Sequence, residues 1–211
     1  MKSSTNISKG VNDENLSIIT SILDGVPHIP FYGTLLGLVR EGVTIPGDDD
    51  VDLIIESVHR NRVLALFQEA GLNVNLDIWP NNVSNCFFQI ELNNKFGSGF
   101  IDIYFVESRK GFLIDRWSFW GTPTVPQCYT KFPKRWLFET KTMKFKDIYI
   151  QIPRESESVL NYLYGHSWVT PHSKGTAYKT FPLAGRPHQA FNKWKIFSNL
   201  YLRILRFIYT R

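Results

Sequence analysis

Four aspartates lie within five consecutive residues of this chain, in the segment Asp48-Asp49-Asp50-Val51-Asp52. They stand directly before an apolar run, Leu53-Ile54-Ile55, which is typical of a buried β-strand. So much like charge in one place is unfavourable unless a cation lies among the carboxylates. Since alternate residues of a strand share a face, Asp49 is predicted to point away from the other three aspartates. Carboxylates gathered on one face are good ligands for Mg²⁺ or Mn²⁺, although an acidic surface turn is the plainer alternative.

The segment before the aspartates predicts an anion site. Residues 28–32 are strand-like, and Gly33-Thr34 precedes a short helical run over residues 35–39. Glycine allows a ligand to approach the backbone closely, and threonine caps a helix or offers its hydroxyl. Free N–H groups at a helix N-terminus bind anions, so this turn predicts a phosphate cradle beside the metal site. Arg40 ends the helix and is either a phosphate clamp or an ordinary surface arginine.

Two motifs together resemble a known family. The segments Tyr32–Arg40 and Ile45–Asp52 are similar to the signature of the LicD family, which includes bacterial phosphocholine transferases and is related to fukutin and fukutin-related protein. Gly47 stands where members usually carry a tryptophan, but the carboxylates are intact. A second segment, Tyr164-Gly165 followed by Trp168, resembles the family's closing motif.

The resemblance implies an α+β fold: a nucleotidyltransferase-like core with a mixed β-sheet flanked by helices. Asp50 and Asp52 are then expected to hold the metal, and Asp48 supports that metal or binds a second ion. In the family a third carboxylate sits in an apolar strand. Asp102 is the candidate here, because it interrupts the apolar run 99–106. A carboxylate in such a run is unfavourable unless it is paired or bound to metal, and the alternative is a strand-end aspartate bonded to a loop.

The rest of the chain predicts further elements of this domain, which we place at residues 1–187. The patterns predict helices at 13–24, 57–70 and 155–164, strands at 72–79, 86–92 and 99–106, a hairpin at 141–152 and a loop or lid at 170–187. The only cysteines, Cys86 and Cys128, form no CxxC motif, so neither zinc nor a disulfide framework is indicated. With no apolar signal core and no long apolar run, the expected location is cytoplasmic.

Residues 188–211 are a basic segment of their own. They contain five lysines and arginines and no acid, which equals the formal net charge of +5 of the whole chain. Large apolar residues recur there at spacings of three or four, so a basic amphipathic helix is predicted. It suits the anionic inner face of a membrane, or it packs on the core by its apolar side. Nucleic acid is a poor candidate partner for a chain of pI 9.2, because no recognition motif accompanies the charge.

The resemblance also implies a reaction. A Mg²⁺-dependent enzyme is expected to move a substituted phosphate from a CDP-linked alcohol, such as CDP-choline, CDP-ribitol or CDP-glycerol, to a sugar hydroxyl of a surface glycan or glycolipid. Asp102 is expected to accept the hydroxyl proton, while Gly33 and Thr34 bring N–H groups to the diphosphate. The alternatives are transfer of the nucleotide itself and a non-catalytic scaffold. The scaffold would be marked by lost carboxylates, and none is lost.

Overall fold

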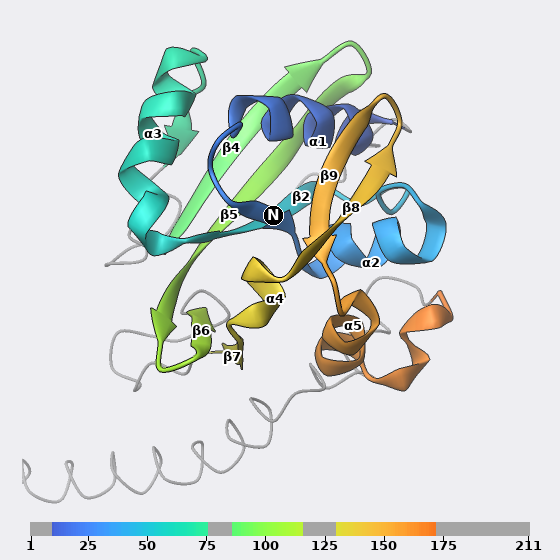
Figure 1. Cartoon of the computed structure of the whole chain (residues 1–211). Helices are drawn as coiled ribbons and strands as arrows, with labels where there is room; N and C mark the ends of the chain where they lie inside the picture. The colour runs from blue at the N-terminus through green and yellow to red at the C-terminus, as the bar shows by residue number, and fades with distance from the viewer. Residues whose placement is uncertain (1–9, 76–85, 116–129, 172–211) are drawn as a thin grey trace, which may run out of the picture.

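A computed structural model describes residues 10–75, 86–115 and 130–171 (Figure 1). Its helices are α1 (Val11–Ile22), α2 (Tyr32–Glu41), α3 (Arg60–Glu69), α4 (Arg135–Phe138) and α5 (Ser156–Tyr164), with 3₁₀ turns η1 (Ser57–His59) and η3 (His166–Val169). Its strands are β1 (His28–Pro30), β2 (Asp50–Glu56), β3 (Val74–Asn75), β4 (Phe87–Asn94), β5 (Gly97–Arg109), β6 (Phe112–Asp115), β7 (Thr130–Pro133), β8 (Thr140–Phe145) and β9 (Ile148–Pro153).

The strands form one mixed sheet and one separate hairpin. The main path of the sheet is β1-β2-β5-β4-β3, and the C-terminal end of the long strand β5 also pairs with β6, which pairs with β7. Within this sheet β2 and β5 run parallel, while the other pairs are antiparallel. Strands β8 and β9 make the hairpin. Together with the helices that flank the sheet, this confirms the predicted α+β architecture.

The centre of the sheet is almost wholly apolar. In β2, residues Leu53 to Ile55 are fully buried, and Ile101 and Ile103 of the neighbouring strand β5 are equally buried. Such runs belong to strands that are covered on both faces. Asp52 and Asp102 are buried polar exceptions in these two strands, with 6% and 7% exposure. The sheet therefore brings two acids into its own interior.

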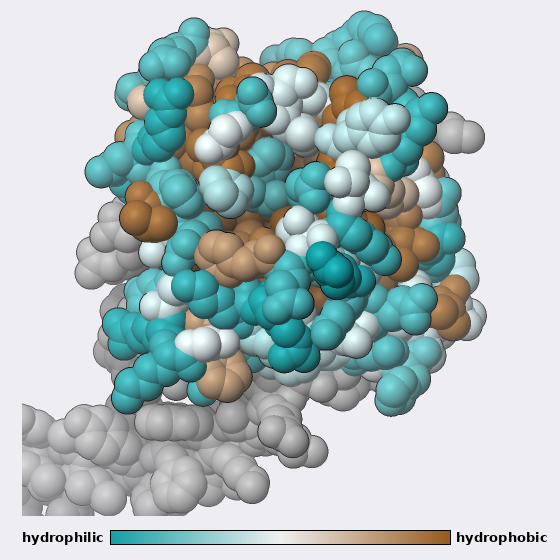
Figure 2. Space-filling model, in the orientation of Figure 1, coloured by the Kyte–Doolittle hydropathy of each residue, from teal (hydrophilic) through white to brown (hydrophobic). Residues whose placement is uncertain are grey.

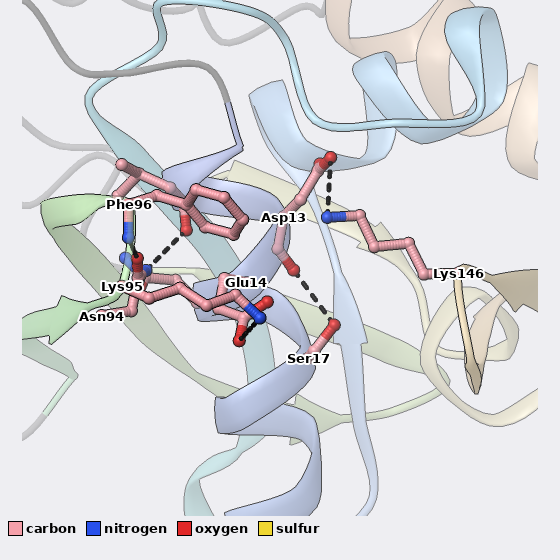
Figure 3. Close-up of polar contacts among 9 residues, drawn as sticks. Asp13, Glu14, Ser17, Asn94, Lys95, Phe96 and Lys146 are labelled. Carbon is pink, nitrogen blue, oxygen red and sulfur yellow. Dashed lines mark hydrogen bonds and ion pairs between the residues drawn. The ribbon is translucent and has the colours of Figure 1, made fainter.

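Helix α1 is anchored between two hairpins (Figure 3). On one side, Nζ of Lys95 in the β4–β5 turn lies 3.2 Å from Oε1 of Glu14. On the other, Nζ of Lys146 in the β8–β9 turn lies 3.2 Å from Oδ2 of Asp13. Such half-exposed ion pairs add little stability, so the buried apolar face of α1 supplies most of the attachment. The N-terminal turn of α1 is nevertheless fixed in place relative to the sheet.

Most predicted elements are present, with shifted ends. The helix predicted at 13–24 is α1, the helix at 57–70 is η1 followed by α3, and the hairpin at 141–152 is β8–β9. The strand predicted at 28–32 ends at Pro30, because α2 already begins at Tyr32. Residues 76–79 of a predicted strand, most of the predicted lid at 170–187 and the basic segment 188–211 lie outside the described residues.

The surface shown in Figure 2 is mostly hydrophilic, and hydrophobic residues are visible between the polar ones. Among the described helices, none has both the length and the apolar character needed to cross a bilayer.

Candidate active site

The aspartate segment folds as a turn followed by a strand. Strand β2 begins at Asp50, so Asp48 and Asp49 lie in the turn before it. Alternation of side chains therefore holds only for Asp50 and Asp52. The prediction that Asp49 points away from the others is wrong, since its carboxylate has an oxygen within 4.8 Å of oxygens of both Asp48 and Asp50. The period of a strand does not extend into the turn that precedes it.

Asp102 joins the aspartates from the neighbouring strand. In the parallel pair β2–β5, Asp52 lies opposite Asp102. Asp50, Asp52 and Asp102 each place a carboxylate oxygen within 4.8 Å of the other two. Gln89 of β4 also lies opposite Asp102, and its side-chain amide donates a hydrogen bond of 2.8 Å to Oδ1 of Asp102. The sheet thus brings Asp102 to two carboxylates that precede it by 52 and 50 residues in the sequence.

The N-terminus of α2 is directed at Asp52. The main-chain N–H of Gly33 donates to Oδ2 of Asp52 over 3.1 Å. In return, the main-chain N–H of Asp52 donates to the Thr34 hydroxyl oxygen over 2.8 Å. Both predicted phosphate-binding residues therefore hold Asp52 in this structure. Their contact with a diphosphate stays a prediction.

Gly33 also sets the space around the carboxylates. A Cβ at this position would lie 2.9 Å from Oδ2 of Asp48 and 3.4 Å from Oδ2 of Asp52. Asp48 thus approaches the same turn as Asp52, and its support of a metal stays a prediction. A side chain at this position would therefore displace the ends of the two carboxylates.

The electrostatics of the trio favour a bound cation. Burial, followed by the charges of Asp50, Asp102 and Asp48, raises the pKa of Asp52 well above its usual value. Like charges held this close oppose one another's ionisation, and a divalent cation removes that penalty. Carboxylate oxygens at this separation fit the hard oxygen ligand set of a divalent ion, so the residues present can hold one.

An asparagine on α1 fixes the backbone of the acidic turn. The side-chain amide of Asn12, which is buried, donates to the main-chain oxygens of Asp48 and Asp50 over 2.9 and 3.0 Å. Beside it, Asp13 accepts hydrogen bonds from both the N–H and the hydroxyl of Thr44. Sequence reasoning did not single out Asn12, because an asparagine in an amphipathic helix carries no sign of a partner more than thirty residues away.

Two tyrosines, the buried Tyr104 and the half-buried Tyr32, also belong to the site. The Tyr104 hydroxyl donates to Oδ1 of Asp52 over 3.2 Å, and the Tyr32 hydroxyl donates to the buried carboxylate of Asp115. Burial, with the neighbouring carboxylates, raises the pKa of both tyrosines well above the usual value, so both hydroxyls keep their protons at neutral pH. Tyr104 and Asp115 were not predicted from the sequence.

Arg40 lies at the other end of α2 from Gly33. Its guanidinium donates from Nε and Nη2 to Oε1 of Glu41, over 2.9 and 2.7 Å. The residue thus occupies the last turn of the helix, where a cation is favourable to the helix dipole. A role for Arg40 at a phosphate stays a prediction.

The fold and the site define a class: transferases in which a helix N-terminus and carboxylates from adjacent strands of a mixed sheet share one centre. The family model described as "LicD/FKTN/FKRP, nucleotidyltransferase domain" matches residues 25–155, more than half of the chain. The chain therefore belongs to the LicD/FKTN/FKRP family, and the predicted resemblance is confirmed. The protein is a transferase whose core is a nucleotidyltransferase domain.

Two solved structures are similar in outline. A lincosamide antibiotic adenylyltransferase, LnuA, with lincomycin bound, is 16% identical with a TM-score of 0.49, and the match covers 83% of this chain and 94% of that one. ANT(2")-Ia in complex with adenylyl-2"-tobramycin is 13% identical with a TM-score of 0.43, covering 92% and 98%. At these TM-scores the likenesses carry no argument about substrate. The comparison with curated protein sequences gave no match.

Proposed function

We propose that this protein transfers a substituted phosphate from a CDP-linked alcohol to a sugar hydroxyl of a surface glycan or glycolipid and releases CMP. The observation that carries the proposal is the joining of Asp50, Asp52 and Asp102 on adjacent strands at the N-terminus of α2, within a LicD-family domain. The family membership supports phosphotransfer in glycan modification. The choice of a CDP-linked donor rests on the family resemblance alone.

The proposed reaction forms one phosphorus–oxygen bond and breaks another. The acceptor hydroxyl oxygen attacks the phosphorus that carries the alcohol. The bond from that phosphorus to the bridging oxygen breaks, and CMP leaves with the electron pair. Asp102 accepts the proton of the hydroxyl, and its bond from Gln89 holds the carboxylate in one orientation.

The carboxylates of Asp50, Asp52 and Asp102, supported by Asp48, are proposed to hold Mg²⁺ or Mn²⁺. When bound, the cation supplies positive charge that stabilises the phosphoryl group during transfer. The chain itself contributes preorganisation: Gly33 and Thr34 fix Asp52, and Asn12 fixes the turn that carries Asp48 and Asp50. The N-terminus of α2, whose Gly33 N–H bonds to Asp52, is proposed to favour the anionic diphosphate through the positive end of the helix dipole.

The test is CMP release from a panel of CDP-alcohols with Mg²⁺, with and without a crude glycan acceptor. Asp52→Ala is the inactive control, and Asp147→Ala, a change in the β8–β9 turn, is the control for loss of an acid elsewhere. Acceptor-dependent CMP release from one donor, lost only in Asp52→Ala, is the expected result. No CMP from any donor would contradict the proposal.

The second candidate is transfer of the nucleotide itself, which the nucleotidyltransferase description of the matched domain favours. The attack would then fall on the α-phosphate of a nucleoside triphosphate. The same carboxylates would serve, so the site does not distinguish the two reactions. Diphosphate release and a nucleotidylated acceptor, in place of free CMP, would select this reading.

For residues 188–211 we propose attachment to an anionic membrane surface, a role motivated by the five basic residues and the absence of acids. A chain ending at residue 187 is then expected to lose binding to phosphatidylserine vesicles while keeping activity on a soluble acceptor. Loss of folding in the truncated chain would instead favour a helix packed on the core.

A further inference from the structure

A fully buried carboxylate lies outside the acidic trio. Asp115, at the end of β6, has 0% exposure, and the hydroxyl of Tyr32 donates a hydrogen bond to its Oδ2. The contact joins residues 83 positions apart. A buried carboxylate is unfavourable unless its hydrogen bonds compensate, so Asp115 needs a structural or functional reason. Its partner Tyr32 directly precedes Gly33 in α2.

Tyr32 has an unusual backbone conformation. Its φ is +41°, in the left-handed region that a residue with a large side chain seldom adopts. Such conformations cost roughly 1–3 kcal/mol and persist where the surroundings impose them. The next peptide group carries the Gly33 N–H that bonds to Oδ2 of Asp52 over 3.1 Å. The direction of that N–H therefore depends on the conformation of Tyr32.

The Tyr32 ring also contacts the second support of Asp52. It packs edge-on against Tyr104, with 5.1 Å between the ring centroids and 67° between the planes. Tyr104 in turn donates its hydroxyl to Oδ1 of Asp52 over 3.2 Å. Asp52 is thus held at Oδ2 by the amide after Tyr32 and at Oδ1 by the phenol that Tyr32 packs against.

We propose that Asp115 is a positioning residue for Asp52, acting through Tyr32. By accepting the Tyr32 hydroxyl, Asp115 fixes the ring and the left-handed backbone of Tyr32. These contacts in turn hold both oxygens of Asp52 in the arrangement that binds a divalent cation. The inference rests on the proposed role of Asp52 as a metal ligand. It does not depend on the identity of donor or acceptor.

Mn²⁺ binding to the full chain, measured by calorimetry, tests the proposal without any substrate. Tyr32→Phe removes the hydroxyl and keeps the ring, and we expect it to raise the Kd for Mn²⁺ roughly tenfold, as loss of an outer support of a metal ligand does. Asp115→Leu is expected to act similarly. Asp115→Asn keeps an oxygen that accepts from Tyr32, so its Kd is expected to stay within about threefold of wild type.

The matched control is Tyr162→Phe. Tyr162 donates its hydroxyl to the main-chain oxygen of Lys131 over 2.7 Å and packs its ring against Trp136, so loss of the hydroxyl should leave the Kd unchanged. If Asp115 acts through Tyr32, the Tyr32→Phe/Asp115→Leu double variant binds Mn²⁺ no more weakly than either single variant. Thermal denaturation of each variant separates a loss of folding from a loss of affinity.

An unchanged Kd in Tyr32→Phe, whatever its thermal stability, would overturn the proposal, even if Asp115→Leu does not fold. A wild-type protein whose Mn²⁺ affinity is unaffected by Asp52→Ala would overturn it as well. A different result would contradict the phosphotransfer proposal alone: no CDP-alcohol yields CMP, yet the Mn²⁺ affinities of the variants still follow the expected order.

Discussion

Gly33 donates its main-chain N–H to the carboxylate of Asp52 over 3.1 Å. The helix N-terminus and the acidic strand are thereby joined at one short contact. A Cβ on Gly33 would press on the carboxylates of Asp48 and Asp52.

Gly33→Ala is expected to lower activity by roughly 10- to 100-fold, because small displacements of reacting groups have effects of this size. The added Cβ would lie 2.9 Å from Oδ2 of Asp48 and 3.4 Å from Oδ2 of Asp52, so the carboxylates have to move. The ends of flexible side chains move easily, and the melting temperature should therefore change little. Steady-state kinetics and thermal denaturation measure the two effects. Full activity in this variant would show that the reaction does not depend on the positions of these acids.

Asp52→Asn is expected to stabilise the metal-free protein while abolishing activity. Folding raises the pKa of Asp52, mainly through burial, so the folded state binds the proton more tightly than the unfolded state does. Stability is therefore lost as the pH rises from the unfolded pKa, about 3.9, through the raised folded pKa, and the loss is complete above it. Asparagine avoids this loss and keeps both contacts, because its oxygen accepts from Gly33 and its NH₂ donates to the Tyr104 hydroxyl.

The measurement is the melting temperature of both proteins in a chelator across that pH range. The melting temperature of the variant should exceed that of the wild type, and the difference should grow with pH to about 2–4 °C. This corresponds to about 1 kcal/mol of folding free energy in a domain of this size. Adding Mg²⁺ should raise the melting temperature of the wild type alone. A variant that is less stable than wild type at pH 8 without metal would show that the Asp52 charge is already compensated.

The sequence was sufficient for the parts of the site that local patterns encode. Asp102 was identifiable because a carboxylate interrupts an apolar strand, and the structure places it opposite Asp52. Asp50 and Asp52 were identifiable because they lead into such a strand. The error over Asp49 arose because the pattern does not show at which residue the strand begins, and the structure begins it at Asp50.

The supports of the site were not identifiable, because they are made by the tertiary fold. The Asn12 side chain bonds to carbonyls 36 and 38 residues away in the sequence. Neither the residue type nor its spacing in an amphipathic helix predicts these hydrogen bonds. Asp115 ends a short strand whose place in the sheet depends on its pairing with β5. Hydrogen bonds to the main chain leave no side-chain pattern at the accepting residue, so only the assembled sheet shows them.

Asn12→Leu tests the support of the acidic turn. Leucine has a similar volume but no donor, so the carbonyl oxygens of Asp48 and Asp50 lose the hydrogen bonds from Asn12. The expected loss is about 1–3 kcal/mol of folding free energy, with a higher Mg²⁺ concentration for half-maximal activity. Ser21→Ala on the same helix is the control, because the Ser21 hydroxyl bonds only within α1, to Ser17, and is exposed. Urea denaturation and a Mg²⁺ titration of activity give the two values, and equal results for both variants would contradict the proposed support.

The sign of the stability change in Gly37→Ala tests whether residues 43–45 pack against α2. In the interior of an ordinary helix this change is stabilising by roughly 0.5–1 kcal/mol, because alanine is the better helix former. Here a Cβ would lie 2.7 Å from both the main-chain nitrogen of Ile45 and the main-chain oxygen of Val43, so backbone would have to shift. We expect destabilisation by about 1–3 kcal/mol, as in other overpacked sites, measured by urea denaturation. The displaced segment leads directly into Asp48, so Mn²⁺ affinity should fall together with stability. A stabilised variant would mean that residues 43–45 do not pack against α2 in solution, and the acidic turn would then lack the backing that this close contact provides.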